Sequence, residues 1–247
     1  MAETRLIMGM PITVDIVDSQ ADDLRAQVFR YFEAVDRNFS TYIETSEVNC
    51  INRGEIAIGD VSAAMGEVLS LAEDTRIASD GFFNVLRSDG KLDPSGIVKG
   101  WAIGKAAAMI EASGARNFFV EAGGDIQAKG RSEDGSVWRV GVRSPFADNE
   151  IIKVLRLADA GIATSGAYVR GAHIYDPHDP ARKLTEIVSM TVVAKSVVDA
   201  DRFATAAFAM GADGVYFIEA LEGVEAYAVD AQGMATQTTG FGAYVAS

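Results

Sequence analysis

The chain is poor in the features that mark secreted, membrane and nucleic-acid-binding proteins. It has a single cysteine, Cys50, which excludes a disulfide within the chain. It has no apolar run of the ~20 residues that cross a bilayer. The N-terminal segment alternates like a strand and carries Pro11 and Asp15, unlike a secretory signal. No basic run offsets the net charge of −13, which argues against a nucleic-acid surface. We therefore expect a cytoplasmic protein.

The 247 residues are enough for a sizeable core, and no internal repeat or long linker divides them. We therefore expect one domain, residues 1–247. Strands and helices do not alternate regularly, which predicts an α+β fold with mixed or antiparallel sheets packed against helices. Expected helices begin near Ser19, at Ser62, at Ile97 and around Asp201. Expected strands cover 5–17, 118–121, 126–128, 137–142, 155–160, 161–164, 173–175 and 187–194, with a final hairpin of 225–229 and 234–238.

Asp201 and Thr205 lie four residues apart in a segment with a helical apolar stripe that Gly211 is expected to end. Residues at this spacing share one helix face, so a carboxylate and a hydroxyl point together. Both are hard oxygen ligands of the kind that Mg²⁺ accepts. Asp199 is the more natural N-cap of this helix, which leaves Asp201 without an obvious structural role. The alternative is two solvent-facing or capping residues on an amphipathic helix.

The segment 92–100, Leu-Asp-Pro-Ser-Gly-Ile-Val-Lys-Gly, joins a polar loop to a helix start, where the helix dipole favours an anion. Lys99 could add a positive charge to a phosphate. Gly96 could let a carbonyl face a metal without steric obstruction. Gly100 and Gly104 cost about 1 kcal/mol each in a helix, which indicates a close approach to the backbone. The alternative is an ordinary helix start with a surface lysine.

Further short motifs lie in the second half of the chain. Gly123 and Gly124 follow a buried strand. They could leave room for a ligand to lie against the backbone, or they could form a simple hairpin turn. Residues 163–166, Ala-Thr-Ser-Gly, and 173–177, His-Ile-Tyr-Asp-Pro, form a third cluster. His173 is one of only two histidines, and a lone histidine is more often structural than catalytic.

Taken in order, these segments resemble the ApbE family, the FAD:protein FMN transferases, over nearly the whole chain. The resemblance is to a short form without the signal peptide and lipoprotein signal of many relatives. The matching segments are Met8-Gly9, 39–42 with 46–48 and 51–52, 80–83, 92–100, 121–125, 164–166, 173–177, and 201–205 with 210–211.

The resemblance implies a T-fold-related flavin transferase fold that binds FAD and Mg²⁺, with Mn²⁺ suited to the same oxygens. FMN would pass to a Thr or Ser of a target flavoprotein, and AMP would leave. The metal ligands would be Asp201, Thr205 and the carbonyl of Gly96. The FAD site would hold Met8, Tyr42, Phe83, Asp93, Lys99, His173 and Tyr175. The general base would be His173 or Asp93, and Asp201 would also serve the reaction.

Several positions depart from the family pattern. Gly104 stands where an acidic residue is usual, and Asn84 stands where an aspartate is usual. The segment between Asn84 and Asp93 is short, which removes a loop that helps to cover the flavin. These departures leave open two alternatives: an FAD pyrophosphatase that releases FMN and AMP, and a flavin-binding protein without turnover.

Overall fold

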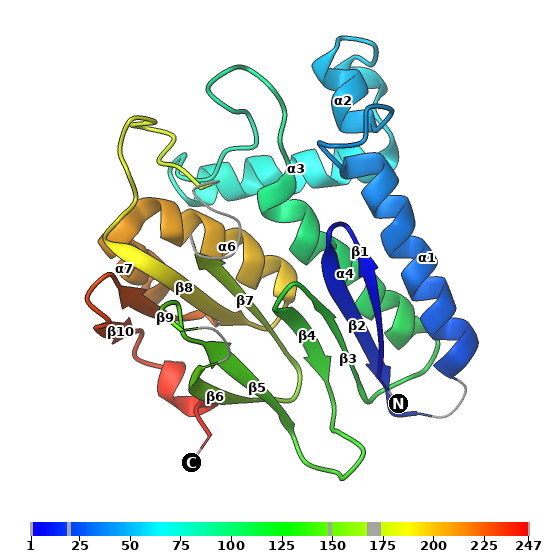
Figure 1. Ribbon diagram of the computed structural model, residues 1–247, viewed down its shortest axis with the longest axis vertical. Helices are drawn as coiled ribbons and strands as arrows, with labels where there is room; N and C mark the ends of the chain where they lie inside the picture. The colour runs from blue at the N-terminus through cyan, green and yellow to red at the C-terminus, as the bar shows by residue number, and fades with distance from the viewer. Residues whose placement is uncertain (1, 19–20, 148–149, 167–173, 247) are drawn as a thin grey trace.

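The computed structural model describes residues 2–18, 21–147, 150–166 and 174–246 (Figure 1). Its centre is an eight-stranded sheet in which all neighbouring strands are antiparallel, in the order β1-β2-β3-β4-β7-β8-β9-β10. A two-stranded sheet of β5 and β6 completes the strands of the described chain. Their bounds are β1 Glu3–Ile7, β2 Met10–Ile16, β3 Phe118–Ala122, β4 Asp125–Lys129, β5 Trp138–Arg143, β6 Ile151–Leu157, β7 Ala160–Gly166, β8 Ile187–Ala194, β9 Glu225–Asp230 and β10 Ala235–Gln237.

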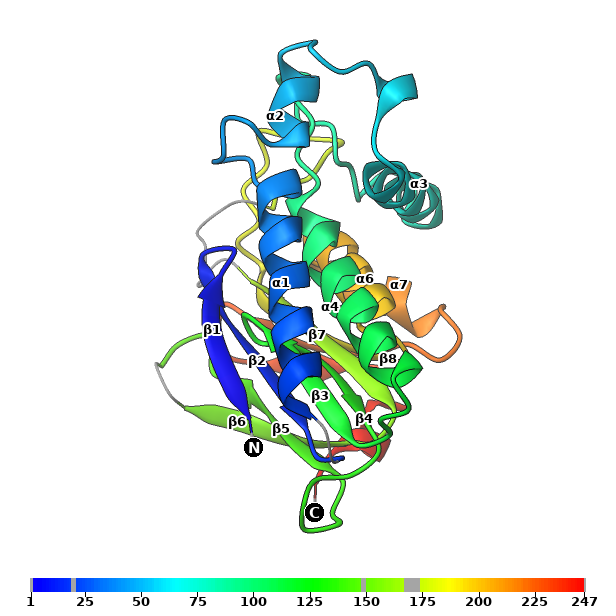
Figure 2. The ribbon, with the colours of Figure 1, turned by 90° about the vertical axis from the view of Figure 1, so that its right-hand side faces the viewer.

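Helices α1 (Ala21–Phe39), α4 (Ser95–Ala112) and α6 (Val197–Met210) cover one face of the large sheet, and β5 and β6 lie on the other side (Figure 2). This arrangement confirms the expected α+β class. The helices are α1 Ala21–Phe39, α2 Glu47–Asn52, α3 Ala63–Ala78, α4 Ser95–Ala112, α6 Val197–Met210 and α7 Gly214–Glu219, with short 3-10 turns at Ile58–Asp60, Gly211–Asp213 and Phe241–Tyr244. No helix in the described ranges is long and apolar enough to cross a bilayer.

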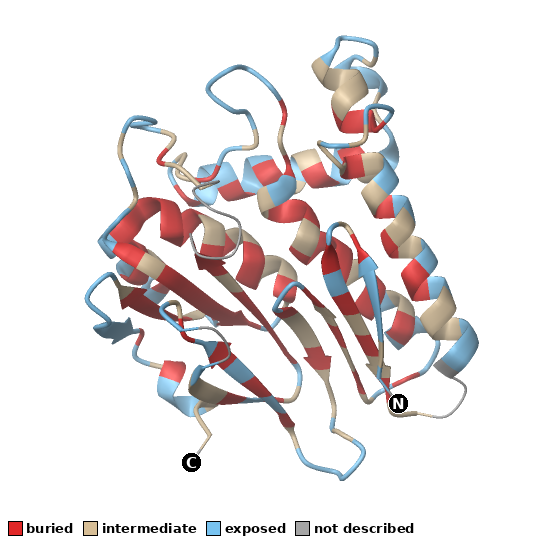
Figure 3. Ribbon diagram, viewed as in Figure 1, coloured by how far each residue is buried: buried red, intermediate tan, exposed pale blue. Residues whose placement is uncertain are grey.

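Among the described residues, the core consists of three apolar clusters that meet the sheet, and buried residues are drawn red in Figure 3. The first places α1 and α4 against β2 and β3, with Phe29 and Phe32 fully buried. The second packs α6 and α7 on β8 and β9. The third lies between the β5–β6 sheet and the opposite face of the large sheet, around Leu155 and Phe241. Burial on both faces explains why β8 is apolar almost throughout.

Helices α4 and α6 cross with their backbones close together, because glycine occupies two contact positions on α4. A Cβ at Gly100 would lie 2.6 Å from the Cβ of Asp201, and one at Gly104 would lie 2.6 Å from Cγ2 of Val198. The expectation that these glycines permit a close approach is thus confirmed. The crossing carries Asp201 to the start of α4.

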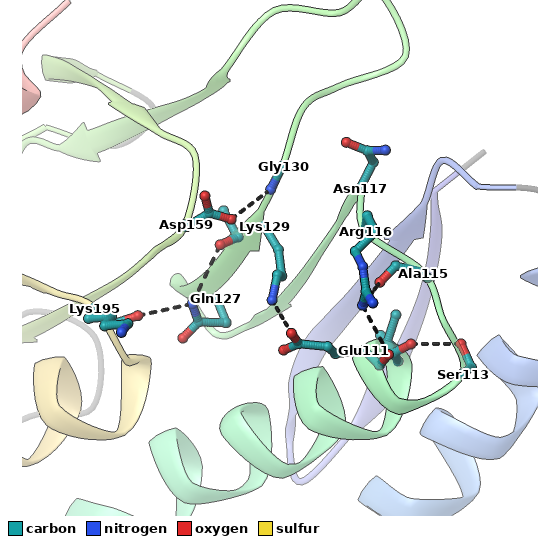
Figure 4. Close-up of polar contacts among 12 residues, drawn as sticks. Glu111, Ser113, Ala115, Arg116, Asn117, Gln127, Lys129, Gly130, Asp159 and Lys195 are labelled. Carbon is teal, nitrogen blue, oxygen red and sulfur yellow. Dashed lines mark hydrogen bonds and ion pairs between the residues drawn. The ribbon is translucent and has the colours of Figure 1, made fainter.

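The far end of α4 is tied to the sheet by polar contacts. Lys129 on β4 pairs with Glu111 near the end of α4, and Gln127 reaches the carbonyl of Lys195 (Figure 4). The amide oxygen of Gln127 also accepts the N–H of Val197, the first residue of α6. These contacts hold α4 and α6 against β4. They therefore fix the position of the two helices relative to each other.

Some expected elements were wrong. The strand expected over 5–17 is a hairpin of β1 and β2, because Met8 and Gly9 both take positive φ and turn the chain. Alternation alone cannot reveal a turn whose first residue is not glycine. The N-cap of α6 is Ser196, which accepts the N–H of Val198, and not Asp199. Asp199 lies in the first helical turn, where it pairs with Arg202.

Other corrections concern boundaries and short elements. The strand expected over 155–160 is the end of β6 and the start of β7, separated by a turn at 158–159. The short helix α2 was not among the expected elements, and the hydroxyl of its N-cap, Ser46, accepts the N–H of Asn49. Of the strand expected over 173–175, position 173 lies outside the described residues, and Ile174 and Tyr175 are irregular.

Candidate active site

A pocket of about 380 Å³ opens where several strand ends meet the first turn of α4, a size typical of small-molecule sites. The β1–β2 turn, the β3–β4 turn, the ends of β5 and β7, and α6 all contribute to its wall. The lining residues are Gly9, Met10, Pro11, Phe82, Phe83, Asn84, Arg87, Asp93, Ser95, Gly96, Lys99, Glu121, Gly123, Gly124, Arg143, Thr164, Ser165, Gly166, Ile174, Tyr175, Pro177, Asp201 and Thr205.

Three neutral oxygens converge on one side of the pocket. The hydroxyl of Thr205 donates to the carbonyl of Gly96 at 3.3 Å. The hydroxyl of Ser165, at the end of β7, lies 3.4 Å from that of Thr205. A Cβ at Gly96 would lie 3.3 Å from the methyl of Thr205, so glycine allows this contact without displacement of α6. The Gly96–Thr205 pairing expected for a metal site is therefore present.

Asp201 lines the same pocket as these oxygens, and the residue is only 4% exposed. Its Oδ2 accepts the backbone N–H of Gly100 at 2.7 Å, and its Oδ1 lies 3.8 Å from Nζ of Lys99. Burial raises the pKa of Asp201 to about 7; Lys99 opposes this shift, and the nearby Asp125 adds to it. A buried carboxylate of this kind gains from a cation that enters the pocket.

Lys99 is held by a second buried carboxylate. Its Nζ lies 2.6 Å from Oδ2 of Asp125, which is 1% exposed. Oδ1 of Asp125 accepts the N–H of Thr164 at 3.0 Å, so this side chain joins β4, β7 and α4. The ammonium of Lys99 therefore lies between two carboxylates at the pocket wall. Lys99 is thus not the solvent-exposed surface lysine of the alternative interpretation.

The donor set fits Mg²⁺. In the described ranges, no three His, Cys, Asp or Glu side chains cluster in a way that could hold a metal. A cation here would instead use one carboxylate together with hydroxyl and carbonyl oxygens, from Asp201, Thr205 and Gly96. Mg²⁺ is commonly held by one or two carboxylates and by the phosphates of its substrate. The chemistry of these oxygens thus matches a metal shared with a phosphorylated ligand.

Two arginines add positive charge to the pocket. Arg87, on the loop before α4, pairs with Asp89 at 3.2 Å. Arg143, the last residue of β5, also lines the pocket, and no acidic side chain in the described ranges pairs with it. Arg143 is thus a cation at the site that an anionic ligand can engage without breaking an existing ion pair.

The short segment between Asn84 and Asp93 forms an ordered wall of the pocket. Leu86 and Leu92 form an isolated bridge, and the amide of Asn52 bonds both backbone groups of Leu92, at 2.7 and 2.9 Å. The hydroxyl of Tyr175 donates to the carbonyl of Leu86 at 3.3 Å, and burial raises its pKa. The shortened loop therefore lines the pocket through Asn84 and Arg87.

Most of the residues predicted for the site line this pocket: Phe83, Asp93, Gly96, Lys99, Tyr175, Asp201 and Thr205. Met8 lies in the turn just before Gly9 and Met10, which do line it. Tyr42 does not line it, and its side chain is 97% exposed. His173 lies outside the described residues. The roles assigned to these residues stay predictions.

The sequence did not identify Arg143, Ser165 or Asp125 as site residues. Asp125 and Ser165 lie inside motifs already noted in the sequence, so the sequence did indicate their neighbourhood. Nothing in the sequence indicated Arg143, because it ends an ordinary alternating strand and is brought to the pocket by the tertiary fold alone.

The model of the ApbE family matches residues 8–88 and 85–228. FAD:protein FMN transferase of Vibrio cholerae is 36% identical over 129 residues, which cover 49% of this chain and 39% of that protein. The Haemophilus influenzae protein of the same name is 33% identical over 132 residues, covering 49% of this chain and 38% of its own length. The matches thus span about two-fifths of each relative.

Solved structures share the fold. The flavin transferase ApbE from Vibrio cholerae superposes with a TM-score of 0.83 at 24% identity, covering 99% of this chain and 98% of that one. The ApbE protein from Thermotoga maritima gives a TM-score of 0.87 at 20% identity, over 100% and 99% of the two chains. At this identity the likeness concerns the arrangement of helices and strands.

Proposed function

This chain belongs to the ApbE family, and we propose that it is a Mg²⁺-dependent FAD:protein FMN transferase. It would attach FMN through a phosphoester to a Thr or Ser of a target flavoprotein and release AMP. The observation that carries the proposal is the convergence of Asp201, Thr205 and Gly96 beside the Lys99–Asp125 pair in one pocket. The names of the relatives support the same activity.

The chain's own groups suit a pyrophosphate. The first turn of α4 faces the pocket with Ser95 and Gly96, and a helix N-terminus favours an anion. Arg143 adds a positive charge that no acidic side chain of the described residues pairs with, and Lys99 offsets part of the charge of Asp125 and Asp201. Mg²⁺ or Mn²⁺, held by Asp201, Thr205 and Gly96, would neutralise charge on the phosphates and on the leaving AMP.

In the transfer, the acceptor hydroxyl oxygen forms a bond to the FMN phosphorus, and the bond from that phosphorus to the AMP oxygen breaks. The hydroxyl proton passes to a base. Asp93 lines the pocket, and its Oδ1 accepts the N–H of Ser95 at 3.1 Å, which orients the carboxylate there. Of the two candidates for the base, Asp93 lies among the described residues and lines the pocket, and His173 remains the other candidate.

The test combines the protein with FAD, Mg²⁺ and a flavoprotein that carries an acceptor threonine. Mass spectrometry should find FMN on that protein and AMP in solution, and Asp201→Asn should lose both products. Because Asn keeps the shape of Asp, the acceptance of the Gly100 N–H can survive, and circular dichroism would show whether the variant folds. Intact FAD and an unmodified acceptor under every metal condition would refute the proposal.

The same experiment separates the alternatives. FMN and AMP released without an acceptor would identify an FAD pyrophosphatase. Bound FAD that stays intact would identify a flavin-binding protein. We place the acceptor in the cytoplasm and treat residues 1–247 as one catalytic domain, and fractionation of cells and limited proteolysis would check these two points.

A further inference from the structure

The outward face of the β5–β6 sheet gathers three arginines. Trp138, Val140 and Val142 point inward and are buried, so the alternate residues of β5 point outward. Arg139 and Arg143 are both exposed on this side. The register places Arg139 directly opposite Arg156 of β6, which is also exposed. We call Arg139, Arg143 and Arg156 the arginine face.

This arrangement is unfavourable for the sheet alone. Like charges directly opposite each other on neighbouring strands destabilise the pair. Throughout the described ranges, no acidic side chain forms an ion pair with any member of the arginine face. The chain nevertheless carries 35 acidic residues against 22 basic ones, so suitable partners are plentiful elsewhere. A basic face without counterions on an acidic protein is complementary to an acidic partner.

The arginine face leads into the pocket. Arg143 ends β5 and lines the pocket, and it lies about 13 Å along the strand from Arg139. Between them, the side chain of Ile151 packs over Gly141, where a Cβ would lie 2.8 Å from it. Ile151 is exposed, as is Phe146 just beyond the strand. Arginine beside exposed apolar side chains is typical of protein interfaces.

We propose that the arginine face docks an acidic segment of the acceptor protein and directs its Thr or Ser into the pocket. This inference rests on the proposed function, because it assigns the second substrate of the same site. An extended segment of about four residues spans the distance from Arg139 to Arg143. Nucleic acid fits less well, since the net charge of −13 repels a long polyanion beyond the arginine face.

The test compares two charge reversals of equal size on the full chain. Arg139→Glu with Arg156→Glu reverses two of the three charges of the arginine face, whereas Arg30→Glu with Arg37→Glu changes two exposed arginines of α1 on the helical side. The probe is a fluorescein-labelled peptide of aspartate and glutamate around one threonine, followed by fluorescence anisotropy. The wild type and the α1 variant should bind it with similar affinity. The β5–β6 variant should bind at least about tenfold more weakly, and added salt should weaken the wild type.

Three further measurements make the outcome decisive. FAD affinity should be unchanged in both variants, because neither alters a pocket-lining residue. Arg139→Gln with Arg156→Gln removes the two charges without reversing them and should also lose peptide affinity. This variant replaces the charge-reversal variant if the latter does not fold. A single-stranded RNA oligonucleotide of equal charge should bind more weakly than the peptide.

Equal loss in the two charge-reversal variants, no peptide binding by the wild type, or a preference for the RNA would each overturn the inference. Peptide and FAD binding are measured without turnover. A failure to transfer FMN would therefore refute the proposed function and leave this test intact.

Discussion

The backbone N–H of Gly100 donates to Oδ2 of Asp201 at 2.7 Å, and a Cβ at position 100 would lie 2.6 Å from the Cβ of Asp201. The close crossing of α4 and α6 and the placement of the buried carboxylate are therefore one structural feature. The hydrogen bond partly satisfies a carboxylate that burial would otherwise disfavour. One helical turn earlier on α4, Gly96 makes the next contact of the crossing, with Thr205 of α6.

Gly100→Ala should push α6 away from α4 and lower the free energy of unfolding by about 1–3 kcal/mol, because the added methyl has no room. It should also weaken Mg²⁺-dependent FAD binding by displacing Asp201. Urea unfolding and a FAD titration measure the two effects.

Gly66→Ala in α3 is the matched control, since the nearest atom to a Cβ there is 4.0 Å away. This change should raise stability by about 0.5–1 kcal/mol, as expected for glycine in an open helical position. Wild-type stability in Gly100→Ala would show that the crossing is looser than the contacts indicate.

Thr205→Val should lower the affinity for Mg²⁺ at least about tenfold, because it replaces the hydroxyl near the Gly96 carbonyl with a methyl of similar size. Thr205→Ser keeps the oxygen and should retain most of the affinity. The measurement is FAD binding against Mg²⁺ concentration after treatment with EDTA. Equal behaviour of the valine and serine variants would remove Thr205 from the metal site.

The local part of the site could be predicted from the sequence, because it depends on spacing within one element. Asp201 and Thr205 share a helix face by their spacing, and Gly96 and Lys99 lie at a helix start. The contact between the two helices could only be inferred from the resemblance. Its physical basis is Gly100, whose missing side chain lets α6 approach.

The rest depends on tertiary structure that short patterns do not contain. The alternation of β5 predicts a strand, but the pattern does not say that β5 pairs with β6 outside the large sheet. The position of Arg143 in the pocket and the pairing of Arg139 with Arg156 follow from that topology. Ser196 and Asp199 are both good caps, and the choice between them depends on where β8 ends.

Arg143→Gln should weaken the binding of FAD and ADP about tenfold, because it removes a cation that no described acidic side chain neutralises. Binding of riboflavin, which has no phosphate, should not change. Arg139→Gln, on the same strand face but outside the pocket, should leave all three affinities as they are. Calorimetric titration of the three ligands checks this, and an equal loss for riboflavin would mean that Arg143 shapes the pocket and does not bind phosphate.

Asp201 should make the stability of the metal-free protein depend on pH. Burial raises its folded pKa from 3.8 to about 7, so the folded state holds this proton more tightly than the unfolded chain does. The contribution of Asp201 to the free energy of unfolding is therefore greatest below about pH 4. It falls as the pH rises toward 7 and is constant above that, with each unit of pKa shift worth about 1.4 kcal/mol.

Asp201→Asn stays neutral and lacks this dependence, so its stability relative to the wild type should increase between about pH 4 and pH 7 by up to a few kcal/mol. Urea unfolding in EDTA across this range measures the difference. Asp74→Asn, at an exposed position of α3, controls for the loss of one negative charge. A difference that stays constant with pH would show that Lys99 compensates the buried carboxylate fully, and that Asp201 is ionised in the folded protein throughout the range.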